Sequence, residues 1–254
     1  MLLVYDGTFE GYLSVVFEVY KRKLEPTEIT AKEHFQHTMF TSKEEITTDF
    51  DHAERVWKGL QQKLKPELNQ IPYSAWLSGE KGIEMALLEY IRQAFILPLS
   101  VEGNFGDANI LTVRKAARRV MREAMRVLQF VRFQCTLDGI YFSAISPEYD
   151  VLPLTIKQLQ NRFADQNWVV YDLKRDYGFY YNKKTSEEIT LADKTFSRST
   201  GAMPANLLQE EEGFYQQAWI GYCKSTTIRE RLNPKLQRQH MPKRFWKYLT
   251  EKKR

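Results

Sequence analysis

Residues 113–133 show the clearest alternation of apolar and polar positions in the chain. At about 100° per residue, the apolar side chains gather on one side of a helix and the cations on the other. The apolar side holds Val113, Ala117, Val120, Ala124, Val127, Leu128 and Val131. The other side holds Arg114, Lys115, Arg118, Arg119, Arg122 and Arg126, and Glu123 is the single acidic residue in the stretch. Like charges at i,i+4 destabilise a helix, so this face indicates a polyanionic partner, most simply nucleic acid.

The first 112 residues carry mainly helical patterns. A short apolar run at residues 2–5 predicts a strand, and residues 28–40 are ambiguous but fit a strand followed by a turn. Thr8 can cap the first helix, and Asp49 or Asp51 can cap the second. Helices are expected at residues 9–23, from 49 or 51 to near Pro66, and at 78–96.

Strand signals dominate the middle of the second half. Residues 132–136 and 140–145 flank Leu137-Asp138-Gly139, a hairpin sequence. A second hairpin is expected at 168–171 and 178–181, with an edge strand at 188–191. Helices are expected at 154–163, 210–232 and 243–251. We therefore predict an α+β fold, mostly helical, with a small antiparallel sheet of hairpins in the second half.

The charge is distributed unevenly. Residues 1–112 carry 11 Lys and Arg against 17 Asp and Glu, whereas residues 113–254 carry 26 against 15. Such asymmetry is typical of a nucleic-acid-binding region joined to a more neutral body, although excess charge can also serve solubility alone. We expect one domain over residues 1–254; the alternative is a helical subregion 1–112 and a basic α+β subregion 113–254.

The composition excludes several classes of protein. No run approaches the ~18 apolar residues of a membrane span, and Asp6 comes too early for a signal peptide, so we expect a cytoplasmic protein without membrane contact. Cys135 and Cys223 are too few for a disulfide scaffold or a structural zinc site. His34 and His37 lie three residues apart beside Glu33, but no cluster of carboxylates or cysteines accompanies them. The sequence predicts neither a metal site nor a resident cofactor.

Two regions can carry chemistry or binding. The phosphate-loop, dinucleotide-binding, nucleophile-elbow and zinc-deaminase motifs are all missing. The hairpin region offers carboxylates near aromatic rings, which suits a general base or the orientation of a flipped nucleobase, although these residues also fit turns and strands. Its candidates are Asp150, Asp172, Tyr141 and Tyr177.

The end of the chain interleaves cations with aromatic residues. Lys243, Arg244 and Lys247 can neutralise phosphates. Phe245, Trp246 and Leu249 instead suit a helix that packs on the core. We expect the aromatic residues to be core and the cations to be functional.

The chain resembles a bacterial family of DNA metabolism or repair proteins. The motifs that carry the resemblance span most of the chain. They are Val4 to Gly11, Arg122-Glu123, Phe130-Val131-Arg132-Phe133, Gly139-Ile140-Tyr141, Val151-Leu152-Pro153-Leu154, Asn161-Arg162-Phe163, Trp168, Tyr171-Asp172 and Gln239 to Trp246. The resemblance implies a DNA context, a radical-SAM protein encoded alongside, and a related domain fused to uracil-DNA glycosylase-like proteins. It transfers no catalytic residues.

These observations favour a DNA-associated accessory protein that works with a radical-SAM partner, or with a uracil-DNA glycosylase-like protein. Its DNA-binding candidates are Arg114, Arg118, Arg119, Arg122, Arg126, Lys243, Arg244 and Lys247. Two alternatives stay open: an enzyme acting on a modified or damaged nucleobase, and a module that docks on an acidic protein.

Overall fold

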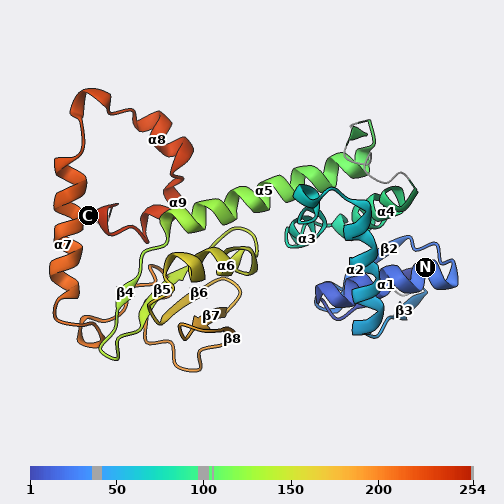
Figure 1. The fold of residues 1–254 in the computed structure, drawn as a ribbon, viewed down its shortest axis with the longest axis horizontal. Coiled ribbons are helices and arrows are strands. Elements are labelled where there is room, and N and C mark those ends of the chain that lie inside the picture. The colour runs from blue at the N-terminus through green and yellow to red at the C-terminus, as the bar shows by residue number, and fades with distance from the viewer. Residues whose placement is uncertain (36–41, 97–102, 105, 253–254) are drawn as a thin grey trace. The chain divides into compact units, whose positions relative to one another are not determined.

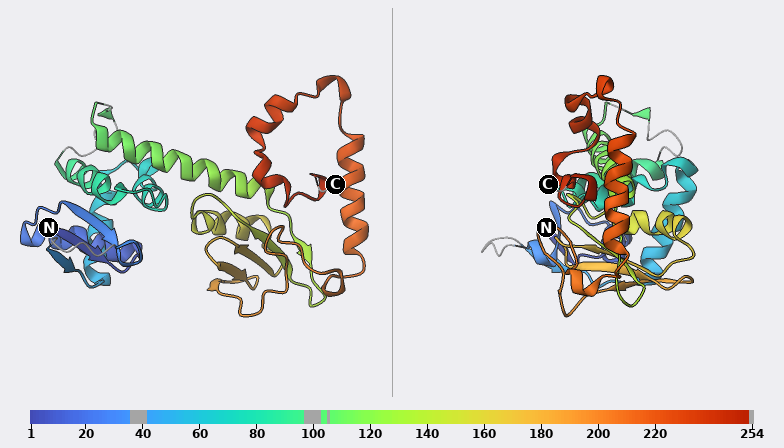
Figure 2. Two further views of the ribbon diagram at one scale, coloured as in Figure 1. Left: turned by 180° about the vertical axis from the view of Figure 1, so that it is seen from behind. Right: turned by 90° about the vertical axis from the view of Figure 1, so that its left-hand side faces the viewer.

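The computed structural model describes residues 1–35, 42–96, 103–104 and 106–252 (Figures 1 and 2). The chain divides into two units, Met1–Met121 and Arg122–Arg254. The division falls within one helix, α5 (Ala108–Phe130). Of the described residues, 51% lie in helices and 14% in strands, which confirms the predicted, mostly helical α+β class.

The first unit combines a parallel sheet with helices. Its strands are β1 (Leu2–Tyr5), β2 (Glu28–Ala31) and β3 (Lys43–Glu45), in the order β2-β1-β3 with both pairings parallel. Its helices are α1 (Phe9–Arg22), α2 (Phe50–Lys63), α3 (Ile71–Trp76), α4 (Ile83–Ile96) and the first part of α5, with 3-10 turns at Lys32–His34 and Pro66–Leu68. The core lies between β1 and helices α1, α2 and α4.

Local capping explains where α1 begins. Thr8 is its N-cap, as predicted, and the Thr8 hydroxyl accepts the Gly11 amide at 2.9 Å. The Asp6 carboxylate in turn accepts the amide and hydroxyl of Thr8 and the hydroxyl of Thr48. Burial raises the pKa of Asp6, but these hydrogen bonds from Thr48 and Thr8 outweigh burial and hold the pKa below its ordinary value.

The second unit is built around a five-stranded sheet in the order β4-β5-β6-β7-β8. Its strands are β4 (Gln134–Cys135), β5 (Tyr141–Ile145), β6 (Trp168–Asp172), β7 (Tyr177–Tyr181) and β8 (Ser186–Ile189). Its helices are α6 (Leu152–Arg162), which lies on one face of the sheet in Figure 1, α7 (Glu212–Ser225), α8 (Pro234–His240) and α9 (Lys243–Trp246). Short 3-10 turns lie at Ala205–Leu207, Arg229–Arg231 and Thr250–Lys252.

Both predicted hairpins are present, but one pairing differs from the expected antiparallel sheet. The β4–β5 and β6–β7 pairs are antiparallel, whereas β5 and β6 run parallel. The reason is the crossover through α6, which returns the chain to the end of the sheet where β5 begins, so that β6 runs in the same direction as β5. In the first unit, β1 matches the strand expected at residues 2–5, and β2 matches the strand considered within residues 28–40. Strand β3 and the parallel pairing of the three strands were not expected.

Several helix limits also differ from expectation. The long basic helix begins at Ala108 because the Asp107 carboxylate caps it, accepting the amides of Asn109 and Ile110 at 2.8 and 3.0 Å. The helix expected from residue 210 ends at Ser225. Pro234 begins α8 instead of only ending a helix, because Asn233 accepts the Leu236 amide and caps it. No helix among the described residues is long and apolar enough to cross a membrane.

Gly178 gives a direct test of the β6–β7 pairing. A Cβ atom at this position would lie 2.4 Å from the Val170 carbonyl oxygen and 2.9 Å from the Tyr171 Cα. We expect Gly178→Ala to lower the free energy of unfolding by about 1–3 kcal/mol, measured by urea denaturation, because backbone must move. Gly221→Ala on α7 is the control, since nothing lies within 4 Å and alanine favours a helix by about 1 kcal/mol. Equal stability changes in the two variants would contradict this packing.

Candidate functional site

Helix α5 has the two faces that its sequence predicts. The apolar positions Val113, Ala117, Val120, Ala124 and Val127 are all buried. Lys115, Arg118 and Arg122 are exposed, and none of the three forms an ion pair with a residue that the structure describes. These cations recur at i, i+3 and i+7, so they follow one stripe along the helix.

Other predicted cations are committed to acidic partners within the protein. Arg119 forms two contacts with Glu80, at 2.9 and 2.5 Å. Arg126 lies 3.6 Å from the Glu123 carboxylate. Arg114 is half-buried at the start of the face. The cationic face of α5 therefore consists of paired and unpaired positions, which the sequence did not distinguish.

Glu123 is a buried ionic centre of the second unit. Only 1% of the residue is exposed, yet it contacts three donors: the guanidinium groups of Arg126 and Arg244 and the Glu148 amide at 3.1 Å. Arg244 also approaches the Glu148 carboxylate at 3.5 Å. A buried carboxylate needs such compensation because an unpaired buried charge is strongly unfavourable. The sequence identified Glu123 as the lone acid of a basic helix and as part of the Arg122-Glu123 motif, but it did not reveal these partners.

The end of the chain packs largely as expected, although Trp246 is only half-buried. Phe245 and Leu249 are buried, and the Phe245 ring lies 5.3 Å from the ring of Phe130. Lys243 and Lys247 are exposed, although Lys247 lies 4.8 Å from the centre of the Tyr248 ring. The two lysines are therefore accessible to an anion, whereas Arg244 is bound to Glu123.

Three of the predicted carboxylate and tyrosine candidates lie at the carboxyl end of β6. Asp172 ends β6, faces Tyr177 in the β6–β7 register and is fully buried. One of its oxygens accepts the amides of Lys174 and Arg175, and the other accepts the Arg175 guanidinium at 2.8 Å. All the acceptor atoms of Asp172 are thus engaged in holding the turn between β6 and β7.

Asp150 is the candidate with the most unusual environment. Its carboxylate accepts the Tyr177 hydroxyl. Burial raises the pKa of Asp150 above its ordinary value, against the opposing effects of Tyr177 and Arg175. Burial and the neighbouring Asp150 charge both raise the pKa of Tyr177. The Tyr177 hydroxyl therefore stays protonated and donates a hydrogen bond to Asp150.

Tyr141 does not join this group. It begins β5 and pairs with Trp168, whereas Asp172 pairs with Ile145 at the opposite end of the same two strands. Burial raises the pKa of Tyr141, with the nearby Cys135 adding to the effect. The predicted aromatic pocket therefore divides into two separate ends of the sheet.

A polar edge forms where the parallel strands β5 and β6 end. The loop at residues 146–150 connects the ionic group around Glu123 with the one around Asp172. The Glu148 amide donates to Glu123, and the Glu148 carbonyl accepts the side chains of Lys174 and Arg175, each at 3.1 Å. The carboxyl ends of parallel strands are where open α/β sheets commonly bind ligands. We define the polar edge as Glu123, Arg126, Glu148, Asp150, Asp172, Arg175, Tyr177 and Arg244.

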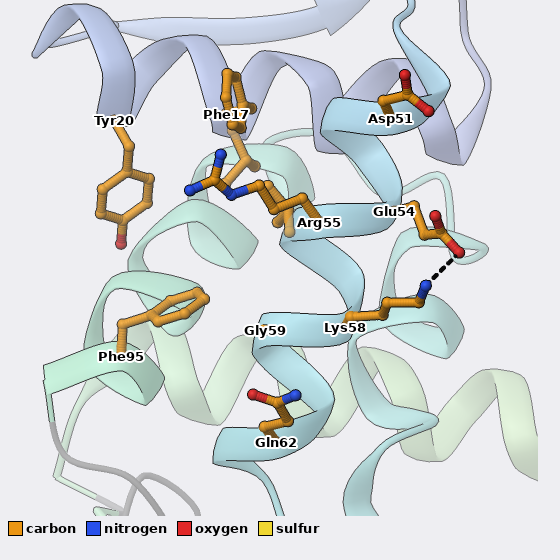
Figure 3. Close-up of a pocket in the computed structure, with 11 residues that line it drawn as sticks. Phe17, Tyr20, Asp51, Glu54, Arg55, Lys58, Gly59, Gln62 and Phe95 are labelled. Carbon is orange, nitrogen blue, oxygen red and sulfur yellow. Dashed lines mark ion pairs between the residues drawn. The ribbon is translucent and has the colours of Figure 1, made fainter.

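The first unit contains a separate cavity of about 630 Å³ between α1, α2 and α4. The Tyr20 ring, the Arg55 guanidinium and the Phe95 ring are among the groups that line it (Figure 3). Gly59 lets Phe95 approach α2, since a Cβ there would lie 3.3 Å from that ring. Because Asp51, Glu54 and Lys58 also line it, the cavity mixes charges of both signs and favours no single class of ligand.

Metal-binding clusters of three or more His, Cys, Asp or Glu side chains do not occur in the described part of the chain. His34 lies 3.8 Å from Glu33 and is exposed, while His37 falls outside the described residues. Cys135 is buried, Cys223 is half-buried, and both are free thiols.

Residues 81–251 match the family model described as a domain of unknown function, DUF4130. The match covers well over half of the chain, so the protein belongs to this family. Neither a curated protein nor a solved structure gives a significant match. The matched range contains the whole polar edge, but the family description names no activity, and the DNA context stays a prediction.

Arg244 and Lys247 allow the structural role of the polar edge to be measured. We expect Arg244→Ala to lower the free energy of unfolding by about 1–3 kcal/mol, because the buried Glu123 carboxylate would keep only Arg126 and one amide. Lys247→Ala, an exposed change nearby, should alter it by less than about 0.5 kcal/mol. Similar effects of the two variants in chemical denaturation would refute the assignment of Arg244 to Glu123.

Asp150 gives an expected dependence of stability on pH. Its pKa is higher in the folded state, so folding favours the protonated carboxyl group and stability falls as pH rises above the ordinary value of 3.8. Asp150→Asn should remove this contribution and flatten the decline between about pH 4 and 7, measured by denaturation midpoints across that range. Parallel pH profiles for the variant and the original protein would be inconsistent with this environment.

Proposed function

We propose that this protein binds DNA and presents it to a partner enzyme. The observation that carries the proposal is the stripe of exposed, unpaired cations on α5, Lys115, Arg118 and Arg122, considered among the described residues. Exposed cations without internal partners are available to phosphates, and each phosphate contact releases a condensed counterion. Lys243 and Lys247 form a second exposed set at the end of the chain.

The cations predicted to bind DNA differ in how readily their side chains can contact a phosphate. Arg119 pairs with Glu80 at a partly exposed position, where solvent screens the pair and a phosphate can compete for the guanidinium. A phosphate can therefore replace Glu80. Arg126 and Arg244 compensate a buried carboxylate, and moving either to DNA would leave Glu123 underpaired. We assign the binding contacts first to Arg118 and Arg122, then to Lys115, Lys243 and Lys247.

The partner is the finer part of the proposal. The resemblance to DNA metabolism and repair proteins supports a radical-SAM protein, or a uracil-DNA glycosylase-like protein, as the enzyme that acts on the presented DNA. In this proposal the chain supplies binding and positioning, and the partner supplies the reaction.

A second candidate function is an enzyme acting on a modified or damaged nucleobase. Asp150 supports it, because a half-buried carboxylate with a raised pKa is suited to general acid–base work. Asp172 fits this role less well because Arg175 and two amides already occupy its oxygens. Base release by the isolated protein from damaged DNA, abolished in Asp150→Asn, would support the enzyme.

DNA binding measured against salt concentration tests the proposal. We expect Arg118→Glu combined with Arg122→Glu to weaken binding to every sequence and to reduce the slope of log affinity against log salt by roughly 1.8, about 0.9 for each lost contact. Fluorescence anisotropy with a labelled duplex provides both quantities.

The matched control is Lys58→Glu combined with Lys65→Glu, which makes the same change in net charge on exposed positions of the first unit. Equal weakening by the two double variants would assign the effect to net charge alone. No DNA binding at low salt, with or without the partner, would overturn the proposal. Nuclease-insensitive co-purification with the partner would then favour a protein-docking module.

A further inference from the structure

Helix α7 exposes an unusual number of large aromatic side chains. Phe214 is 71% exposed, Tyr215 65%, Tyr222 59% and Trp219 40%. One side of α7 faces away from the other elements of its unit (Figure 1). Contiguous exposed apolar surface on a protein commonly marks a binding site.

The spacing of these residues makes a continuous face. Tyr215 and Tyr222 lie seven residues apart, about two turns or ~10 Å along the axis, with the small Ala218 between them. Trp219 lies beside this line and stacks on Tyr222, with ring centres 5.6 Å apart and planes at 26°.

Trp219 is also held in position from the core side. Its indole N–H donates to the Glu251 carboxylate at 2.9 Å, and the Arg132 guanidinium lies 5.5 Å from the centre of its ring. Arg132 itself pairs with Glu251 at 2.8 Å. The Trp219–Tyr222 pair is therefore an anchored aromatic platform whose outer ring remains more than half exposed.

Charge changes sharply along α7. Its amino end follows Glu210 and Glu211, which are exposed, whereas residues 224–254 contain 11 Lys and Arg against two acidic residues. Lys224 lies two residues after Tyr222, and Arg229 and Arg231 lie in the 3-10 turn that follows α7; all three are exposed and form no ion pair with the described residues. The chain segment that follows Tyr222 therefore favours an anionic partner, whereas the acidic segment that precedes Phe214 does not.

We propose that the Trp219–Tyr222 platform and the cations that follow it bind single-stranded nucleic acid. Bases stack on the exposed aromatic surface, and Lys224, Arg229 and Arg231 contact the adjoining phosphates. The strand must be single because duplex bases already stack on each other and do not present their faces. This inference rests on the proposed DNA-binding function and adds the strand type that this part of the chain recognises.

Tyr222→Ala tests the platform against a matched control on the same helix. We expect it to weaken binding of a thymine 12-mer by roughly 5- to 100-fold, the effect of losing one stacked base, and to leave binding of a 12-base-pair duplex unchanged. Phe214→Ala removes an equally exposed ring at the acidic end and should change neither affinity. Thermal unfolding of both variants verifies that the fold is intact. Tyr222→Phe keeps the ring and should bind the 12-mer as the original protein does.

The outcomes separate this inference from the proposed function. Duplex binding that depends on Arg118 and Arg122, with no binding of the 12-mer, overturns the inference alone. Equal losses for Tyr222→Ala and Phe214→Ala, or equal losses for single strand and duplex, also overturn it. Absence of binding to either DNA overturns both proposals. Loss of a co-purifying protein in Tyr222→Ala, without single-strand binding, assigns the platform to protein docking and overturns the inference.

Discussion

The second unit depends on satisfying one buried carboxylate. Glu123 is nearly inaccessible to water, so its charge must be compensated inside the protein. Its donors come from α5 itself, from α9, which is 121 residues away at Arg244, and from the loop after β5, 25 residues away at Glu148. The Glu148 carbonyl in turn accepts hydrogen bonds from the side chains of Lys174 and Arg175, in the turn after β6. One electrostatic requirement thereby determines the positions of three segments that are distant in sequence.

The same requirement divides cations that look equivalent in sequence. Arg122 and Arg126 are one helical turn apart in a basic stretch, yet Arg122 is exposed and Arg126 lies against Glu123. Releasing an exposed pair such as Arg119–Glu80 costs little, whereas uncovering a buried charge costs several kcal/mol. The number of basic residues therefore overstates the surface available to a polyanion. The relevant cations are those that the interior does not require.

Short-range patterns made much of the fold predictable. The two faces of α5, the caps at Thr8 and Asp49 and both hairpins follow from residues close together in sequence. The parallel β5–β6 pairing and the partners of Glu123 depend on distant segments, which periodicity does not reveal. The candidate carboxylates were identified as residue types, but register separated Tyr141 from Asp172 and Tyr177. The aromatic residues of α7 were not singled out from the sequence, because their exposure is evident only from the structure.

The Asp6 carboxylate lies beside Thr8 at the amino end of α1, the helix that follows the parallel strand β1. The amino end of a helix after a parallel strand attracts anions, because unpaired amides and the helix dipole point toward it. Here the chain supplies the anion itself, and Gly11 leaves room for it, since a Cβ there would lie 2.2 Å from an Asp6 carboxylate oxygen. The carboxylate acts as a permanent internal counter-ion, and an incoming phosphate would meet a like charge. The first unit therefore carries its own negative charge at the helix amino end, a position where other proteins commonly bind an anionic ligand.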